Sequence, residues 1–203
     1  MKLYFAGTSP YVRKVVVMAM ETGLDKKIEQ VPTTVIPTQP NLELAKDNPL
    51  MKLPTLVTDD GVALYDSYVI CDYLDSLHKG EKLIPASGPA RWTVLRLHAL
   101  ASGLTDAGIL CRYENLFHED GKRSDPWLQG QIAKINHGLD ELEKEVKNLT
   151  GPLNIAQIAA GCSIGWLEFR KPAGDIRKGR PKLMAWYDEF AKRPSMQATI
   201  PKA

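Results

Sequence analysis

The fold of this chain is decided by the stretch Asn48-Pro49-Leu50-Met51-Lys52-Leu53-Pro54-Thr55-Leu56-Val57, which places a proline directly before an apolar run. A proline there removes one hydrogen-bond donor from a sheet, and its peptide bond can adopt the cis form. A second apolar run, Val62-Ala63-Leu64-Tyr65, leads to the pair Asp66-Ser67 and then to a helical pattern. Such a pair offers N–H groups and oxygens at the positive end of a helix. The stretch therefore predicts a surface that could bind a small peptide by its main chain and its carboxylate.

The segment before this stretch predicts a strand, a turn and a helix. The strand is Lys2-Leu3-Tyr4-Phe5-Ala6, and the turn is Gly7-Thr8-Ser9-Pro10, in which proline suits the first helical position. Valines and alanines then recur at helical spacing up to a stop at Gly23. With a strand at 28–31 and a short helix at 42–46, the first 80 residues predict an α/β domain with four strands and a thioredoxin-like sheet.

The rest of the chain shows helical periodicity only. Trp92 to Phe117 forms one long pattern, a second helix starts at Ser124, and a final one covers residues 183–190. Asn154 with Gln157 predicts a capping box at the start of another helix. The predicted organisation is an α/β domain at 1–78, a linker at 79–88 and an all-helical domain at 89–203.

Composition excludes several classes of function. The 203 residues are 44% hydrophobic and 25% charged with a net charge of +2, and no basic run suggests a nucleic-acid partner. We expect no membrane span and no signal peptide. The three cysteines are widely separated, show no metal spacing, and favour a reducing cytoplasm.

Four motifs in register resemble the glutathione S-transferase family, closest to bacterial members with a serine-proline active-site turn. They are Ser9-Pro10-Tyr11-Val12-Arg13-Lys14-Val15, Asn48-Pro49 with Lys52-Leu53-Pro54, Asp66-Ser67, and Arg180-Pro181-Lys182-Leu183 with Trp186 and Arg193-Pro194-Ser195. The resemblance covers nearly the whole chain. It implies a thioredoxin-like domain followed by a helical bundle, a homodimer, and glutathione as co-substrate without a metal.

The resemblance gives Ser9 the catalytic role, as the hydroxyl that contacts the glutathione sulfur. A thiol with a pKa of about 8.5 is mostly protonated at neutral pH, and the thiolate is the nucleophile. A hydroxyl donating to sulfur near a helix start favours the anion. Thr8 is the rival donor, and Ser9 could instead be only a helix cap.

The remaining glutathione contacts follow from the same resemblance. The main chain of Leu53, before Pro54, would pair with the cysteinyl segment of the tripeptide, as in strand addition. Asp66 and Ser67 would bind the γ-glutamyl end, and Lys52 could meet the glycyl carboxylate. Family members often carry valine and glutamate where Leu53 and Asp66 stand. A proline that only begins an edge strand and an ordinary helix cap are the structural alternatives.

A second-substrate pocket is expected between the domains, from Tyr11, Cys111, Arg112 and Tyr113. The adjacent arginine could lower the pKa of the Cys111 thiol. The expected function is conjugation of glutathione to a hydrophobic electrophile, as in detoxification. Alternatives are a glutathione-dependent peroxidase or reductase, and a module that binds glutathione or a protein without catalysis.

Overall fold

The structure is a computed structural model that describes residues 1–202 and divides into two compact units. The first unit contains Met1–Ile84 and resumes from Ala198 near the end of the chain. The second unit is Pro85–Gln197. The division between Ile84 and Pro85 falls inside the segment 79–88, which the composition marks as a linker.

The first unit is built on a mixed four-stranded sheet in the order β2-β1-β3-β4. Its strands are β1 (Lys2–Phe5), β2 (Glu29–Pro32), β3 (Thr55–Val57) and β4 (Ala63–Leu64). β1 pairs in parallel with β2 and antiparallel with β3, and β3 pairs antiparallel with β4. The parallel pair requires a crossover connection, which the helix after β1 supplies. The four predicted strands are therefore confirmed.

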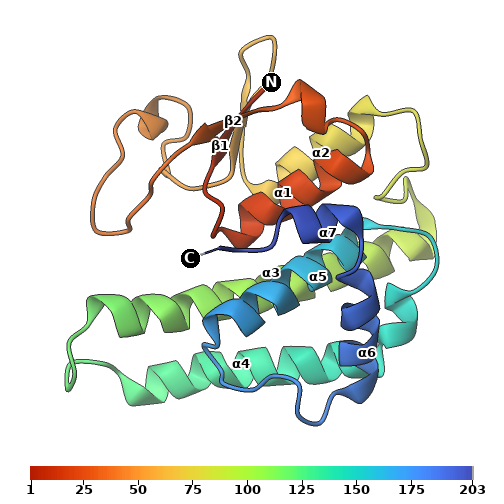
Figure 1. Cartoon of the computed structure of the whole chain (residues 1–203). Helices are drawn as coiled ribbons and strands as arrows, with labels where there is room; N and C mark the ends of the chain where they lie inside the picture. The colour runs from red at the N-terminus through yellow and green to blue at the C-terminus, as the bar shows by residue number, and fades with distance from the viewer. Residues whose placement is uncertain (203) are drawn as a thin grey trace. The chain divides into compact units, whose positions relative to one another are not determined.

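Two helices complete this unit, α1 (Pro10–Glu21) and α2 (Ser67–Leu77), and they pack against each other beside the sheet (Figure 1). Two short 3-10 turns, η1 (Asp25–Lys27) and η2 (Leu44–Lys46), lie in the connections. The apolar residues that set the sequence periodicity are buried between the helices and the sheet. They are Leu3, Val12, Val15, Leu56, Ile70 and Leu74.

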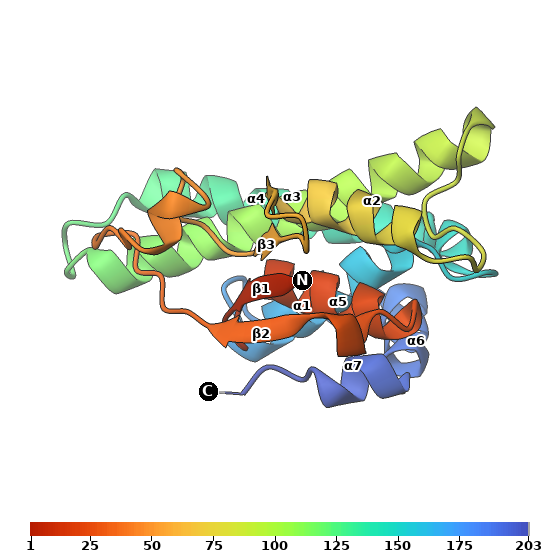
Figure 2. The same cartoon turned by 90° about the horizontal axis from the view of Figure 1, so that it is seen from above.

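The second unit is all-helical. Its elements are α3 (Gly88–Phe117), α4 (Asp125–Lys144), η3 (Val146–Leu149), α5 (Ile155–Arg170), α6 (Pro181–Phe190) and α7 (Pro194–Ala198). The long helix α3 packs against both α4 and α5 (Figures 1 and 2). The structure differs from the sequence pattern in two details. Residues 146–149 form a separate 3-10 turn after α4, and the short helix α7 was not expected.

The helix α5 begins with the expected capping box. Asn154 Oδ1 accepts hydrogen bonds from the N–H groups of Ala156 and Gln157, and Gln157 Oε1 accepts one from the N–H of Asn154. The prediction of a capping box is therefore confirmed. Gln157 Nε2 also donates to the carbonyl of Leu149 at 2.9 Å, so the cap also binds the turn that precedes it.

The helix α3 is long and apolar enough to cross a membrane, by length and composition alone. More than half of its most apolar window is buried inside the structure. The core helix of a soluble protein meets the same test. Packing against α4 and α5 is the use that the structure shows for this apolar surface.

Candidate functional site

Three segments meet at one end of the four-stranded sheet because of its pairing register. Tyr4 in β1 lies opposite Thr55 in β3, so the residues before β3 run alongside the end of β1 and the turn that leads to Ser9. Leu56 lies opposite Leu64 in β4, so the residues after β4 run toward the same end. The Ser9 turn, the segment before β3 and the start of α2 therefore share one edge of the first unit.

Ser9 is the N-cap of α1, and its Oγ accepts a hydrogen bond of 3.3 Å from the N–H of Val12. The capping role that the sequence offered as an alternative is thus present. It does not exclude a ligand contact, because a hydroxyl accepts through a lone pair and donates through its proton. Ser9 is half-buried, so its O–H can still be directed at a group bound in front of the helix.

The loop before β3 is organised by Asn48, a residue buried to 1% exposure. Its Oδ1 accepts from the N–H of Leu50 at 3.0 Å, and its Nδ2 donates to the Lys52 carbonyl and to Thr55 Oγ1. Thr55 Oγ1 in turn donates to the Lys52 carbonyl at 2.9 Å. Sequence reasoning quoted Asn48 only as part of a motif and missed this supporting role. An asparagine before a proline, seven residues from a strand threonine, was the available signal.

The main-chain N–H and carbonyl of Leu53 have no hydrogen-bond partner among residues 1–202. The Leu53–Pro54 peptide bond is cis. The residue is only 9% exposed. Backbone groups that are largely buried are nearly always paired with protein, water or a ligand. The Leu53 main chain therefore keeps the donor and acceptor that the expected contact with an extended peptide requires.

The start of α2 offers a similar pair of unused groups. Asp66 is the N-cap, and its Oδ1 accepts from the N–H of Tyr68 at 2.9 Å. The N–H and the hydroxyl of Ser67 make no hydrogen bond within the part of the chain that the structure describes, and the residue is buried. Free donors at a helix start suit a carboxylate.

Two basic residues near this end of the sheet differ in their surroundings. The Lys52 side chain is exposed and has no ion-pair partner among residues 1–202, so it is available to an anion. Arg13 is buried in α1, and its Nε donates to Thr199 Oγ1 at 3.2 Å, which ties the returning end of the chain to the first unit. Arg13 therefore has a structural role, which is to hold this segment.

The residues expected around a second substrate belong to different units. Tyr11 lies in the first unit, and Cys111, Arg112 and Tyr113 lie in α3 of the second. Cys111 is wholly buried, and burial raises the pKa of its thiol, so the expected lowering by Arg112 was wrong. Arg112 and Tyr113 are half-buried and remain able to contact a ligand. Burial likewise raises the pKa of the Tyr113 hydroxyl.

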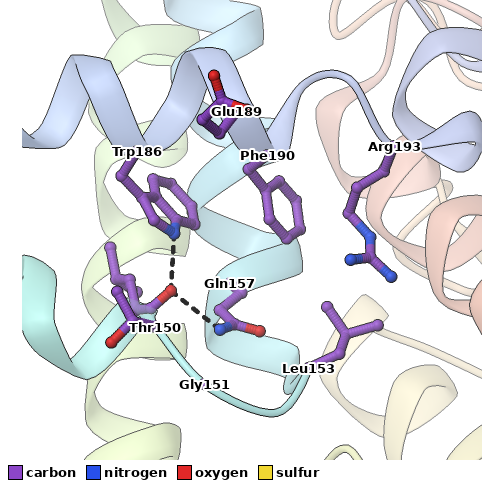
Figure 3. Close-up of a pocket in the computed structure, with 9 residues that line it drawn as sticks. Thr150, Gly151, Leu153, Gln157, Trp186, Glu189, Phe190 and Arg193 are labelled. Carbon is purple, nitrogen blue, oxygen red and sulfur yellow. Dashed lines mark hydrogen bonds between the residues drawn. The ribbon is translucent and has the colours of Figure 1, made fainter.

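A separate pocket of about 280 Å³ lies in the helical unit, between the η3–α5 connection and α6 (Figure 3). None of the residues predicted from the sequence as site residues lines it. Trp186 Nε1 and Gln157 Nε2 both donate to the Leu149 carbonyl at its wall, and Trp186 stacks on Phe190. These contacts support the capping box. Within residues 1–202, the histidine, cysteine and acidic side chains form no cluster of three that could hold a metal.

Comparison with known proteins shows which family the two units resemble. The glutathione S-transferase N-terminal domain family matches residues 8–77, and the corresponding C-terminal domain family matches residues 125–189. A crystal structure of a glutathione transferase family member from Pseudomonas fluorescens Pf-5, with bound glutathione, has 44% identity and a TM-score of 0.97 over 100% of this chain and 99% of that one.

Two further relatives extend the comparison. A second Pseudomonas fluorescens Pf-5 structure, with bound S-(propanoic acid)-glutathione, has 43% identity and a TM-score of 0.93 over the whole of both chains. The uncharacterized GST-like protein YibF of Escherichia coli K12 is 31% identical over 99% of this chain and 98% of its own length. By both domain matches and by these full-length relatives, the chain belongs to the glutathione S-transferase family, and it has that family's fold.

Proposed function

We propose that this protein is a glutathione transferase that joins the sulfur of glutathione to an electrophile. The observation that carries the proposal is the unused main chain of Leu53, at the edge that the Ser9 turn and Ser67 share. In this assignment Leu53 pairs with the cysteinyl unit, while Ser67 and the start of α2 bind the γ-glutamyl carboxylate. Asp66 lies near the γ-glutamyl amine, and Lys52 meets the glycyl carboxylate.

Ser9 is assigned the catalytic role. Its O–H donates to the sulfur of bound glutathione and favours the thiolate over the thiol, with the positive end of α1 adding to the effect. Lowering the thiol pKa by about two units requires roughly 2.7 kcal/mol of differential stabilisation. The thiolate then attacks the electrophile directly, so no covalent intermediate on the protein is needed.

The relatives support the choice of co-substrate. One Pseudomonas structure holds glutathione, and the other holds a glutathione thioether with a propanoic acid group. A thioether of this kind is what conjugation produces. The proposal therefore favours conjugation over glutathione-dependent peroxide reduction, which would leave a disulfide.

The experiment is a pH titration of thiolate absorbance in the complex of the protein with glutathione. Ser9→Ala should raise the pKa of the bound thiol by one to two units and lower kcat/KM for 1-chloro-2,4-dinitrobenzene by about 10- to 100-fold. Glutathione affinity, measured by calorimetry, should change little. If Thr8→Ala produces these effects and Ser9→Ala does not, Thr8 is the donor. Absence of glutathione binding would favour the non-catalytic module, and activity with cumene hydroperoxide alone would favour the peroxidase.

Assembly and location complete the proposal. We infer a cytoplasmic homodimer with a role in detoxification. None of the three cysteines forms a disulfide and all are buried, which is consistent with a reducing compartment. Light scattering at micromolar concentration tests the dimer, and fractionation of the source cells tests the location.

A further inference from the structure

We propose that Arg112 and Arg170 form a site on the helical unit for the carboxylate of an organic acid, and that the electrophile of the transferase is such an acid. The anion site depends on α3 and α5 alone. The identity of its ligand as the electrophile rests on the proposed function.

The packing of α3 on α5 brings the two arginines together. Thr105 in α3 and Ser163 in α5 share a hydrogen bond of 2.7 Å between their hydroxyls, and their residue numbers differ by 58. One turn further on, a Cβ built on Gly108 would lie 2.8 Å from Cζ3 of Trp166, and the numbers of these two residues differ by 58 as well. The two helices therefore run in parallel with a constant register. The next turn places Arg112 beside Arg170.

The other arginines of the helical unit show how this protein normally satisfies a guanidinium. Five of them donate hydrogen bonds to carboxylates or carbonyls: Arg91, Arg96, Arg123, Arg177 and Arg180. Arg112 and Arg170 have neither a hydrogen bond nor an ion pair within residues 1–202. Glu168, two residues before Arg170, is bound by Arg177 and supplies no counter-charge.

The guanidinium of Arg170 has a buried donor that no group within residues 1–202 satisfies. This donor is Nε, and the guanidinium lies 4.2 Å from the centroid of the Phe169 ring. Burial, and then the charge of Arg112, lower the pKa of Arg170. The negative C-terminal end of α5 stabilises the charge of Arg170. A second unpaired cation beside it, Arg112, is unfavourable without an anion, because the two positive charges repel each other. A carboxylate would offset the repulsion and accept from the unused donors.

The side chains around the pair indicate a planar, partly apolar acid. Tyr113 and Phe117 form a tilted aromatic pair with centroids 5.6 Å apart in α3, and Phe169 lies under the Arg170 guanidinium. A flat unsaturated or aromatic acid can contact these rings while its carboxylate meets the guanidiniums. The matched probes are 4-chloro-3,5-dinitrobenzoate and its neutral amide. With either probe, the thiolate forms a carbon–sulfur bond at the ring carbon, chloride leaves with the electron pair, and the thiol proton passes to solvent.

The experiment compares kcat/KM for the two probes in the full-length protein, each corrected for its uncatalysed rate. The wild type should prefer the benzoate. Arg112→Gln and Arg170→Gln should each lower kcat/KM for the benzoate by about tenfold, and leave that for the amide within about twofold. Arg112→Lys should recover part of the loss, because it restores the charge without the bidentate geometry. Arg123→Gln, which removes a half-buried arginine paired with Asp120, is the matched control and should change neither value.

The outcomes separate this inference from the proposed function. Equal losses for the acid and the amide would assign the two arginines to packing, and a wild type without preference for the acid would overturn the inference. In both cases, calorimetric binding of glutathione would leave the transferase proposal standing. If Arg170→Gln fails to fold, the half-buried Arg112 decides the question alone.

Discussion

Asn48 Nδ2 donates a hydrogen bond of 2.9 Å to Thr55 Oγ1 and thereby closes the loop that carries Leu53. The same amide group donates to the Lys52 carbonyl, so one buried side chain binds the residue before Leu53 and the threonine that follows Pro54. The position of the proposed glutathione-binding edge therefore depends on a residue outside the proposed set of glutathione contacts.

Asn48→Ala should destabilise the protein and weaken glutathione binding together. Removal of the amide leaves the Lys52 carbonyl with one donor fewer and the Leu50 N–H without its acceptor, at a cost of about 1–3 kcal/mol. Urea unfolding and glutathione calorimetry measure the two effects. Asn115→Ala, at an exposed position in α3, is the control and should leave glutathione affinity unchanged. Wild-type affinity in the Asn48 variant would show that the loop does not need this support.

Substitution of Ser67 should change mainly the affinity for glutathione, whereas substitution of Asp66 should lower the stability of the protein. Ser67→Ala removes a hydroxyl that the protein does not use, so we expect the glutathione Kd to rise about tenfold with a stability change below about 0.5 kcal/mol. Asp66→Ala removes the cap on the Tyr68 N–H and should cost about 1 kcal/mol in stability. Thermal unfolding and calorimetry test the pair. A Ser67 variant that binds glutathione as the wild type does would remove this residue from the site.

Asn154→Ala should cost about 1 kcal/mol, because the substitution deletes the cap of α5. Ser124 is the matched control, since it is the N-cap of α4 but makes no side-chain capping bond. Ser124→Ala should therefore cost much less than Asn154→Ala in the same denaturation assay. Equal costs would mean that the capping hydrogen bonds of Asn154 contribute nothing measurable.

Glu145 should contribute stability that disappears in acid. The hydrogen bond from Arg96, with a smaller contribution from Asn148, lowers the pKa of this carboxyl from 4.5 to about 2. A group whose pKa is lower in the folded state stabilises the fold above its unfolded pKa and loses that effect as pH falls through its folded pKa. The difference in unfolding free energy between wild type and Glu145→Gln should therefore be largest at neutral pH and shrink between about pH 4.5 and 2. Because Arg96 is 53% exposed, solvent screening keeps this difference in unfolding free energy below about 1 kcal/mol. A difference independent of pH would contradict this prediction.

Much of the fold could be predicted because local signals and burial agree. The proline before Thr55, the helical spacing of Val12 and Val15, and the pair Asn154 and Gln157 each specify one local structure. The 3-10 turn at 146–149 and the helix α7 were missed, since a single helical turn leaves almost no periodicity to detect.

The site was less accessible to sequence reasoning. Ser9, Leu53 and Ser67 were named by resemblance, and their assignment stays a prediction. The support from Asn48 was missed, because the Asn-Pro signal does not say which side of the loop the side chain faces. The pKa of the Cys111 thiol was misjudged for a related reason: its neighbour in sequence is charged, but the thiol is wholly buried, and burial raises its pKa.

The bond between Arg13 and Thr199 has a consequence for synthesis on the ribosome. The first unit gains the segment from Ala198 only after the whole helical unit has been translated. A nascent chain that has produced all four strands still lacks the contact that Thr199 makes with α1. Consolidation of this unit is therefore coupled to late elongation, and a pulse-labelled chain halted before Ala198 should remain more sensitive to protease within residues 1–84 than the finished one.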